Sequence, residues 1–233
     1  MRVYGLIFSA IATALGLLAA FLITLGYPAL GGLLAWIGFG FAYGGLAYFW
    51  ERPQLFAKGQ EGRLGAAPTL LCLPGLALNY LRWWLERRLG AERVNDEVAP
   101  GLHVGGLPAP ADLPPGTRTI VDLTCEFFAH PRVAEHAGYR TYPMLDDSFV
   151  EPDELEAIVR TLLDAPTPIL IHCAVGHSRS ASLAAAYGIA RGDFEDVDSA
   201  ERAMQVARPR IRYTSIQRER LTRWYLDHHR PAD

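Results

Sequence analysis

An uncharged stretch near the beginning constrains this chain more than any other feature of its sequence. From Val3 to Trp50 there is no Asp, Glu, Lys, Arg or His. One helical crossing of a membrane takes roughly 20 apolar residues, so a stretch of 48 residues is long enough for two. Gly26-Tyr27-Pro28 divides it, because proline cannot continue a helix and glycine tolerates the bend. We therefore expect two transmembrane helices within residues 1–50.

Two other interpretations of this stretch are weaker. Arg2 followed by an apolar run is also how a secretory signal peptide begins, but here a second apolar run follows at once. A buried soluble hairpin would need a polar face toward water, and neither segment has one. The second segment is rich in glycine, which allows close packing between membrane helices. These glycines are Gly31, Gly32, Gly38, Gly40, Gly44 and Gly45.

Basic residues lie at both ends of the expected hairpin, but not in the turn between its two helices. Arg2 precedes it, whereas the turn between the two helices carries no charge. The basic residues that follow it are Arg52, Lys58 and Arg63. Positively charged flanks stay in the cytoplasm. We therefore expect a two-pass membrane protein with both ends of the hairpin, and the rest of the chain, on the cytoplasmic side.

Residues 51–94 are expected to form a linker with an amphipathic helix at the membrane surface. The segment from Thr69 to Leu85 is short for a crossing, and Pro74-Gly75 is expected to break it. Trp83-Trp84 and the basic residues that follow suit the headgroup layer of the inner leaflet. A third crossing is the alternative, and it would place the rest of the chain outside.

The remaining residues have the composition of a soluble domain. Segments typical of strands alternate with segments typical of helices, which predicts an α/β fold around a mostly parallel sheet in residues 95–233. The expected strands are Leu102–Val104, Arg118–Leu123, Tyr139–Met144 and Ile169–Ile171. The expected helices are Pro152–Leu163, Ser180–Arg191, Asp198–Val206 and Ser215–His228.

The segment from Ile169 to Ala181 carries the strongest signal for chemistry. A short apolar run leads into Cys173, Gly176 follows three residues later, and Arg179 follows six residues later. A strand that turns tightly into a helix points successive backbone N–H groups at one spot, where the helix dipole also favours an anion. We expect an oxyanion to bind there, with Cys173 beneath it as a nucleophile and Arg179 across two of its oxygens. The simpler interpretation of a cysteine after a buried strand is inert packing.

Charge and cysteine content narrow the compartment and the partners. The net charge of −3 is too small to suggest a nucleic-acid surface. The three cysteines, Cys72, Cys125 and Cys173, do not make a disulfide framework. A reactive thiol must also stay reduced, and both observations favour the cytoplasm.

His172-Cys173, five further residues and Arg179-Ser180 resemble the signature of the cysteine-based protein tyrosine phosphatases, most closely that of their dual-specificity branch. The resemblance covers about residues 95–225. The expected acid precedes the nucleophile, whereas in the low-molecular-weight phosphatases it follows the loop. The rhodanese-like group lacks this acid, which argues against a resemblance to that group. Three more segments are similar to parts of that branch: Val121–Thr124 to a strand end, Tyr142–Ser148 to the general-acid segment and Ala207–Ile211 to an Arg-Pro segment.

This resemblance implies a mechanism without a metal or another cofactor. Cys173 attacks phosphorus to form a phosphocysteine, and Ser180 helps the sulfur leave afterwards, although Ser180 could instead be the N-cap of the helix. Asp146 aligns with the general acid of the family. Asp147 is the alternative acid, or else a cap of the loop or helix, and His172 supports the loop. The expected substrate-binding residues are Ala174, Val175, Gly176, His177, Ser178 and Arg179.

Three further residues keep open roles at this point. Some family members form a protective disulfide between the nucleophile and a cysteine near the position of Cys125. Arg208 and Arg210 either help to hold an anionic substrate or form a solvated basic turn.

The substrate is the least determined part of the prediction. The sequence lacks the aromatic recognition loop and the Trp-Pro-Asp acid loop of the phosphotyrosine-specific branch, so we expect a shallower pocket. The positions that vary in the family loop carry no Lys or Arg here, which weakens a polyanionic lipid as substrate. We expect a membrane-anchored phosphatase that acts on phosphorylated Ser, Thr or Tyr in proteins. The alternatives are a lipid-phosphate phosphatase of phosphoinositide or phosphatidylglycerophosphate type and an inactive phosphate-binding module.

Overall fold

The computed structural model describes residues 2–90 and 92–229, so the outermost residues of the expected ranges, residue 1 and residues 230–233, lie outside it. The chain divides into two compact units. The helical unit contains Met1–Gly59, Leu64–Arg88 and Cys125–Phe127. The sheet unit contains Gln60–Arg63, Leu89–Thr124 and Phe128–Asp233.

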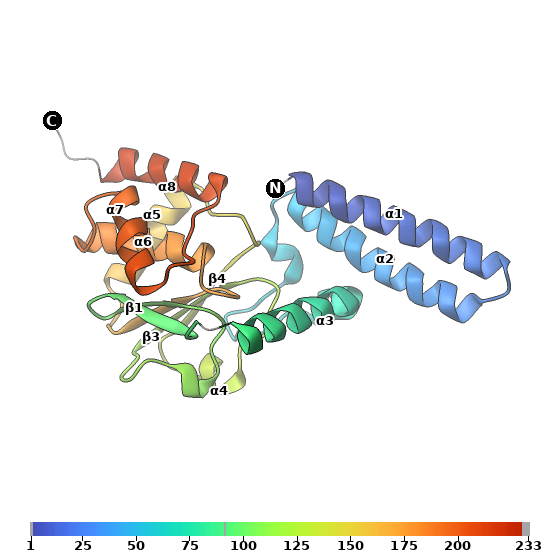
Figure 1. The fold of residues 1–233 in the computed structure, drawn as a ribbon, viewed down its shortest axis with the longest axis horizontal. Coiled ribbons are helices and arrows are strands. Elements are labelled where there is room, and N and C mark those ends of the chain that lie inside the picture. Colours follow the sequence, from blue (N-terminus) through green and yellow to red (C-terminus); the bar gives the residue numbers. More distant parts are fainter. Residues whose placement is uncertain (1, 91, 230–233) are drawn as a thin grey trace. The chain divides into compact units, whose positions relative to one another are not determined.

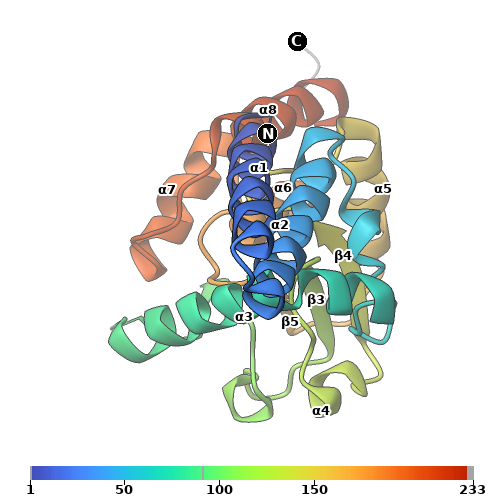
Figure 2. The ribbon, with the colours of Figure 1, turned by 90° about the vertical axis from the view of Figure 1, so that its right-hand side faces the viewer.

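Two long antiparallel helices form a hairpin in the helical unit. α1 spans Arg2–Thr24 and α2 spans Pro28–Phe49, and Figures 1 and 2 both show them packed side by side. The turn between them is the predicted one, with Gly26 at a φ of 88° and Pro28 opening α2. In the described part of the chain, these two helices are long and apolar enough to cross a membrane, with mean hydropathies of 2.5 and 1.4.

Glycines let α1 and α2 approach each other closely at several predicted positions. A Cβ on Gly31 would lie 2.5 Å from Cγ1 of Ile23 in α1. Gly38 and Gly45 have α1 atoms within 3.3 Å of the corresponding position. The packing role predicted for Gly32 is wrong, because that side of α2 faces away from α1 and nothing lies within 4 Å of a Cβ there.

The expected break at Pro74-Gly75 is also wrong, because one helix, α3, runs unbroken over Ala66–Leu89. A proline inside a helix removes the hydrogen bond to the carbonyl four residues earlier, here that of Leu70. The indole Nε1–H of Trp36 in α2 donates to this carbonyl oxygen instead, at 3.1 Å. The neighbouring helix thus satisfies the polar group that the proline leaves without its helical partner, so α3 can continue.

One face of α3 carries large apolar side chains that are exposed. They are Leu70, Leu73, Leu78, Leu81, Trp84, Leu85 and Leu89. The guanidinium groups of Arg87 and Arg88 lie over the rings of Trp83 and Trp84, each 5.3 Å from the ring centroid. An apolar face beside tryptophans and arginines is typical of a segment at a membrane interface.

A short 3-10 helix, η1 (Pro53–Phe56), precedes α3 in the chain.

The sheet unit is built on a five-stranded sheet with the strand order β1-β2-β5-β3-β4. Its strands are β1 (Asn95–Ala99), β2 (Leu102–Gly105), β3 (Thr119–Thr124), β4 (Tyr139–Met144) and β5 (Ile169–His172). β1 pairs antiparallel with β2, and all other neighbours are parallel. The predicted α/β fold with a mostly parallel sheet is therefore confirmed. β1 was not among the expected strands, because this edge strand has no alternation of apolar residues.

The helices of the sheet unit lie on both sides of this sheet. Figure 1 shows α5, α6, α7 and α8 gathered on one side and the short helix α4 on the other. Their bounds are α4 (Pro131–Ala134), α5 (Pro152–Leu163), α6 (Arg179–Arg191), α7 (Val197–Ala207) and α8 (Ser215–His228), and a 3-10 turn, η2 (Pro110–Asp112), follows β2. The core lies between the sheet and the larger helices. The predicted helices begin and end within one residue of the observed ones.

Capping side chains fix where α7 and α8 begin. Asp196 accepts a hydrogen bond from the N–H of Ser199 at 2.7 Å, and the Ser199 hydroxyl accepts one from the N–H of Asp196 at 2.9 Å. Thr214 and Gln217 form the same reciprocal pair at the start of α8. Each pair satisfies N–H groups that a helix start leaves without a partner. The two fixed helices therefore define the path of the segment that connects them.

β5 lies between β2 and β3, and all four of its residues are buried. Ile169 is level with Leu102 of β2 and with Thr119 of β3. The carboxyl ends of parallel strands meet at one edge of a sheet, where ligands bind in many α/β folds. The residues after β5 therefore lie at the centre of that edge.

Candidate active site

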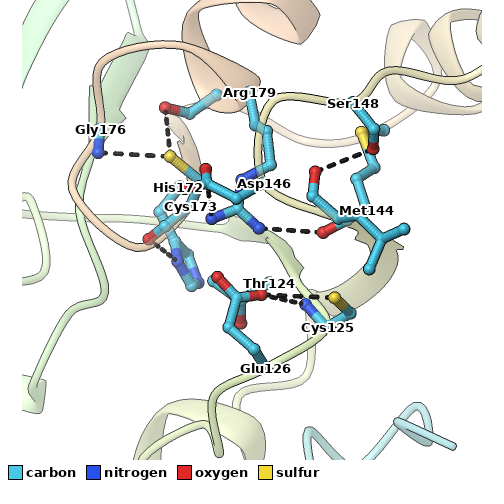
Figure 3. Close-up of polar contacts among 12 residues, drawn as sticks. Thr124, Cys125, Glu126, Met144, Asp146, Ser148, His172, Cys173, Gly176 and Arg179 are labelled. Atoms are coloured by element: carbon cyan, nitrogen blue, oxygen red, sulfur yellow. Dashed lines mark hydrogen bonds and ion pairs between the residues drawn. The ribbon is translucent and has the colours of Figure 1, made fainter. Parts of the chain in front are cut away.

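Residues 173–178 form a tight loop between β5 and α6, which we call the anion loop. Cys173 is buried, and its Sγ lies 3.3 Å from the backbone nitrogen of Gly176 and 3.4 Å from Oγ of Ser180. Figure 3 shows Cys173 and Gly176 facing each other across the loop. The sulfur therefore accepts a hydrogen bond from a backbone N–H and lies within hydrogen-bond distance of a hydroxyl at the base of the loop.

Gly176 determines the shape of the anion loop. Its φ of 82° is a left-handed conformation that residues with a side chain rarely adopt. A Cβ at this position would also lie 2.4 Å from the backbone carbon of Gly105 and 2.7 Å from the nitrogen of Gly106. The loop is held against this end of β2 by the Cys173 N–H, which donates to the carbonyl oxygen of Gly105 at 3.2 Å. Only glycine fits at position 176.

Arg179 connects the anion loop to the end of β4. Nη1 donates to the carbonyl oxygen of Met144 at 2.9 Å, and Nη2 lies 3.2 Å from Oδ1 of Asp146 (Figure 3). The side chain is only 1% exposed. A buried guanidinium is costly without partners of this kind, so these contacts fix its planar fork at the first turn of α6.

Asp146 and Asp147 occupy the central positions of a turn. The Ser148 N–H donates to the carbonyl oxygen of Leu145 at 3.1 Å and closes the turn, and the Ser148 hydroxyl donates to the same oxygen at 2.8 Å. Asp147 has a φ of 56°, a left-handed conformation that Asp tolerates better than most residues. Asp146 pairs with Arg179, while its side chain stays half-exposed.

A buried group of polar side chains lies behind the anion loop. Nε2 of His172 lies 4.0 Å from Oδ2 of Asp122, and neither side chain is exposed. Asp122 accepts hydrogen bonds from the N–H and hydroxyl of Thr124, at 2.8 and 2.7 Å, and from the Tyr139 hydroxyl at 2.7 Å. Burial raises the pKa of Tyr139, which keeps that hydroxyl a donor. With Nδ1 of His172 at 3.3 Å from the carbonyl oxygen of Cys173, this group connects the base of the loop to the sheet.

Arg208 is buried, so the interpretation as a solvated basic turn is wrong for this residue. Its side chain is 3% exposed. Nε donates to the carbonyl oxygen of Gly176 at 2.8 Å, and Nη2 donates to that of Val175 at 2.9 Å. Nη1 donates to the carbonyl oxygen of Arg93 at 2.9 Å and to Oδ2 of Asp96 at 2.8 Å. The guanidinium therefore holds the backbone of the anion loop from outside.

His177 at the rim of the loop is paired with a carboxylate. Its Nε2 lies 2.5 Å from Oε2 of Glu92, and the same oxygen lies 3.7 Å from Nη2 of Arg208 and 3.9 Å from Nη1 of Arg210. Burial lowers the pKa of His177, and the Glu92 hydrogen bond acts in the opposite direction. The carboxylate of Glu92 thus offsets positive charge beside the site.

The structure pairs the predicted arginine, Arg179, with the predicted acid, Asp146, and places the predicted nucleophile, Cys173, at the start of the anion loop that leads to Arg179. Ser178, not Ser180, is the N-cap of α6, so the alternative role of Ser180 as an N-cap is wrong. Its hydroxyl contacts the Cys173 sulfur instead. The other predicted substrate-binding residues, Ala174, Val175, Gly176 and His177, lie in the loop itself.

Several residues of the site were missed by the sequence analysis: Glu92, Asp96, Gly105, Gly106 and Asp122. Gly105-Gly106 directly follows a predicted strand, and that position was a usable signal for a close backbone approach. Glu92 and Asp96 lie in a stretch without periodicity, so nothing local in the sequence marks them.

Among solved structures, human DUSP28 matches this chain with a TM-score of 0.50 and 20% identity, over 59% of this chain and 96% of that one. The human tyrosine phosphatase-like serine/threonine/tyrosine-interacting protein matches with a TM-score of 0.50 and 19% identity, over 59% and 99%. No protein-family model and no curated protein matches the chain. The fold is therefore that of the dual-specificity phosphatases. A fold alone does not decide between catalysis and binding, so function has to be argued from the site.

We expect Gly176→Ala to abolish binding of an oxyanion such as orthovanadate, because the new Cβ collides with the backbone of Gly105. Gly192→Ala is the matched control, since its φ of 84° is also left-handed but nothing lies within 4 Å of a Cβ there. The left-handed backbone costs each variant about 1–2 kcal/mol of stability, and only Gly176→Ala adds the collision. Calorimetric titration of both full-length variants with orthovanadate measures the difference. Equal affinities would contradict this account of the loop.

Proposed function

We propose that this chain is a membrane-anchored, cysteine-dependent phosphatase that hydrolyses phosphomonoesters through a phosphocysteine intermediate. One observation carries the proposal: the buried fork of Arg179 contacts Asp146 at the mouth of a loop whose N–H and hydroxyl groups surround the Cys173 sulfur. A nucleophile, an anion-binding fork and a carboxyl group are the groups that phosphoryl transfer to a thiol requires.

The first chemical step transfers the phosphoryl group to sulfur. The thiolate of Cys173 attacks phosphorus in line, so an S–P bond forms while the P–O bond to the leaving group breaks. Asp146 gives its proton to the departing oxygen, which would otherwise leave as a poor alkoxide or phenoxide. Backbone N–H groups of the anion loop and the guanidinium of Arg179 stabilise the charge on the equatorial oxygens.

The second step returns the enzyme to its starting state. Asp146, now a carboxylate, takes a proton from water as the water oxygen attacks phosphorus. The S–P bond breaks, inorganic phosphate forms, and the Cys173 thiolate is restored. The Ser180 hydroxyl, 3.4 Å from Sγ, donates to the departing sulfur and lowers the cost of its negative charge.

We propose phosphorylated Ser, Thr or Tyr in proteins as the substrate class. The support is the charge at the rim, where Glu92 pairs with His177 and lies close to two arginines. A carboxylate at this position disfavours a headgroup that carries several phosphates. A lipid-phosphate phosphatase is the second candidate, and the observation that favours it is the pair of long apolar helices α1 and α2.

We further propose that α1 and α2 cross the membrane, that the linker of residues 51–94 holds α3 at the inner surface, and that residues 95–233 form the catalytic domain in the cytoplasm. The support is the absence of charge from Val3 to Trp50, the basic residues on either side of this stretch, and the exposed apolar face of α3. Tethering raises the effective concentration of the site toward substrates at the same membrane.

We expect Cys173→Ser to lower phosphate release from an aryl phosphate to background, because a serine hydroxyl is not ionised near neutral pH. Cys72→Ser is the matched control, and it should keep full activity, as should the unmodified protein in EDTA. The mechanism would be overturned if Cys173→Ser still released phosphate, or if EDTA removed the activity of the unmodified protein. With full-length protein and vesicles, faster release from phosphopeptides than from phospholipids supports the proposed substrate class, and the reverse order supports the lipid candidate.

We expect Asp146→Asn to lower kcat by about 100-fold or more for a poor leaving group such as that of a phosphoserine peptide. The variant should also lose the basic limb of the kcat pH profile, which reports the general acid. Asp147→Asn is the matched control, because Asn tolerates the left-handed backbone at 147. Steady-state kinetics from acid to alkaline pH compare the two. A larger loss in Asp147→Asn would assign the acid to Asp147.

We expect Tyr27→Cys, in the turn between α1 and α2, to react with a membrane-impermeant maleimide on intact cells. Lys58→Cys and Arg223→Cys should react only after permeabilisation, because both positions are proposed to face the cytoplasm. The unmodified protein gives the background from the native cysteines. Labelling of Arg223→Cys on intact cells would show instead that a third crossing places the catalytic domain outside.

A further inference from the structure

We propose that Arg208 is a positioning residue that strengthens the hydrogen-bond donors of the anion loop from outside and thereby favours the thiolate form of Cys173. The inference rests on the proposed role of Cys173 as the nucleophile. It assigns a function to a residue that lies between α7 and α8, well beyond the loop in sequence, and that does not need to touch the substrate.

Arg208 and Cys173 contact the same peptide group at its two ends. Nη2 of Arg208 donates to the carbonyl oxygen of Val175 at 2.9 Å. The N–H of that peptide group belongs to Gly176, and it donates to Sγ of Cys173 at 3.3 Å. The next peptide group is held in the same way, because Nε of Arg208 donates to the carbonyl oxygen of Gly176 at 2.8 Å. One peptide group therefore separates the guanidinium from the sulfur.

A positive charge at the carbonyl end of a peptide group makes the N–H at its other end a better donor. Hydrogen bonds in a chain polarise one another, and the effect is larger where water is scarce. The side chain of Arg208 is 3% exposed, so water screens its charge only weakly. Because a donor to sulfur favours the charged form, Arg208 raises the fraction of thiolate.

Two carboxylates limit how much of this charge reaches the loop. Oδ2 of Asp96 lies 2.8 Å from Nη1 of Arg208, and Oε2 of Glu92 lies 3.7 Å from its Nη2. Both oppose the effect of Arg208 on the thiolate. Other charged or titratable side chains around the loop and its arginines include Asp122, Asp146, His172, His177, Arg179 and Arg210.

The opposite charges of Arg208 and Asp96 make it possible to distinguish an electrostatic role of Arg208 from a purely structural one. If Arg208 only held the shape of the loop, then weakening its contact with Asp96 would lower the reactivity of Cys173. If its charge matters, Asp96→Asn should raise that reactivity at low pH. The amide oxygen of Asn can still accept the hydrogen bond from Arg208, but it no longer cancels the charge. Removal of Arg208 should have the opposite effect.

Alkylation of Cys173 by iodoacetamide tests the inference, because the thiolate is the reacting form. Mass spectrometry of the peptide that contains Cys173 gives its rate in full-length protein as a function of pH, free of the other two cysteines. The variants are Asp96→Asn, Asp96→Asn with Arg208→Met, and Arg202→Met, an exposed arginine of α7, as control. The Asp96→Asn background avoids a carboxylate left without its partner.

At low pH we expect Asp96→Asn to react faster than the unmodified protein. Arg208→Met in that background should react about tenfold more slowly than Asp96→Asn, as expected for the loss of one charge-assisted interaction. All rates should converge at high pH, where every thiol is ionised, and Arg202→Met should match the unmodified protein. A slower Asp96→Asn, or equal rates for Asp96→Asn with and without Arg208→Met, would overturn the inference.

Arg208→Lys in the same background provides a second variant if Arg208→Met does not fold. Lysine keeps the charge, but its single nitrogen cannot reproduce the planar fork that holds both carbonyl groups. Because the charge is kept, we expect a rate at low pH within about threefold of that of Asp96→Asn, and a loss of about tenfold or more would overturn the inference. Alkylation does not require catalysis. Phosphatase activity that survives Cys173→Ser would therefore refute the proposed function while leaving these rates interpretable.

Discussion

The close approach of Gly176 to the end of β2 is the contact on which the rest of the site depends. Parallel pairing of β5 with β2 brings the two segments together, and the absence of a side chain at 106 and 176 lets their backbones touch. That contact turns the chain sharply after Cys173. As a result, the N–H of Gly176 points at the sulfur, and α6 begins with Arg179 already at the site.

Charge around the anion loop is arranged in two layers. Arg179 lies on the substrate side and is paired with Asp146, whereas Arg208 lies on the outer side and is paired with Asp96. Under the proposed function, the first pair is the one that an arriving phosphate would disrupt. In the second pair Arg208 is buried, and its hydrogen bonds to the loop carbonyl groups keep its charge beside the backbone donors. The anion loop thus lies between the Arg179–Asp146 pair, which a bound phosphate would separate, and the Arg208–Asp96 pair, which it would leave in place.

Local sequence patterns account for much of the fold and part of the site. The apolar run of β5, the amphipathic α5 and the glycine-proline turn before α2 each carry their own signal, and each was predicted nearly residue by residue. The remaining features depend on contacts between distant segments. α3 continues through Pro74 because Trp36 supplies a donor, and Arg208 is buried because carbonyl groups of the anion loop receive its hydrogen bonds. No pattern around Pro74 or Arg208 reveals these partners.

In the proposed mechanism, the phosphoryl group passes through the sulfur of Cys173. Ser180→Ala should slow the departure of sulfur more than its attack, so the intermediate should accumulate in this variant. Rapid quenching of full-length Ser180→Ala during turnover, followed by mass spectrometry, measures where the phosphate is held. We expect up to one phosphate per chain, on Cys173, and none in Cys173→Ser. A phosphate on another residue, or turnover with no covalent phosphate at any time, would contradict it.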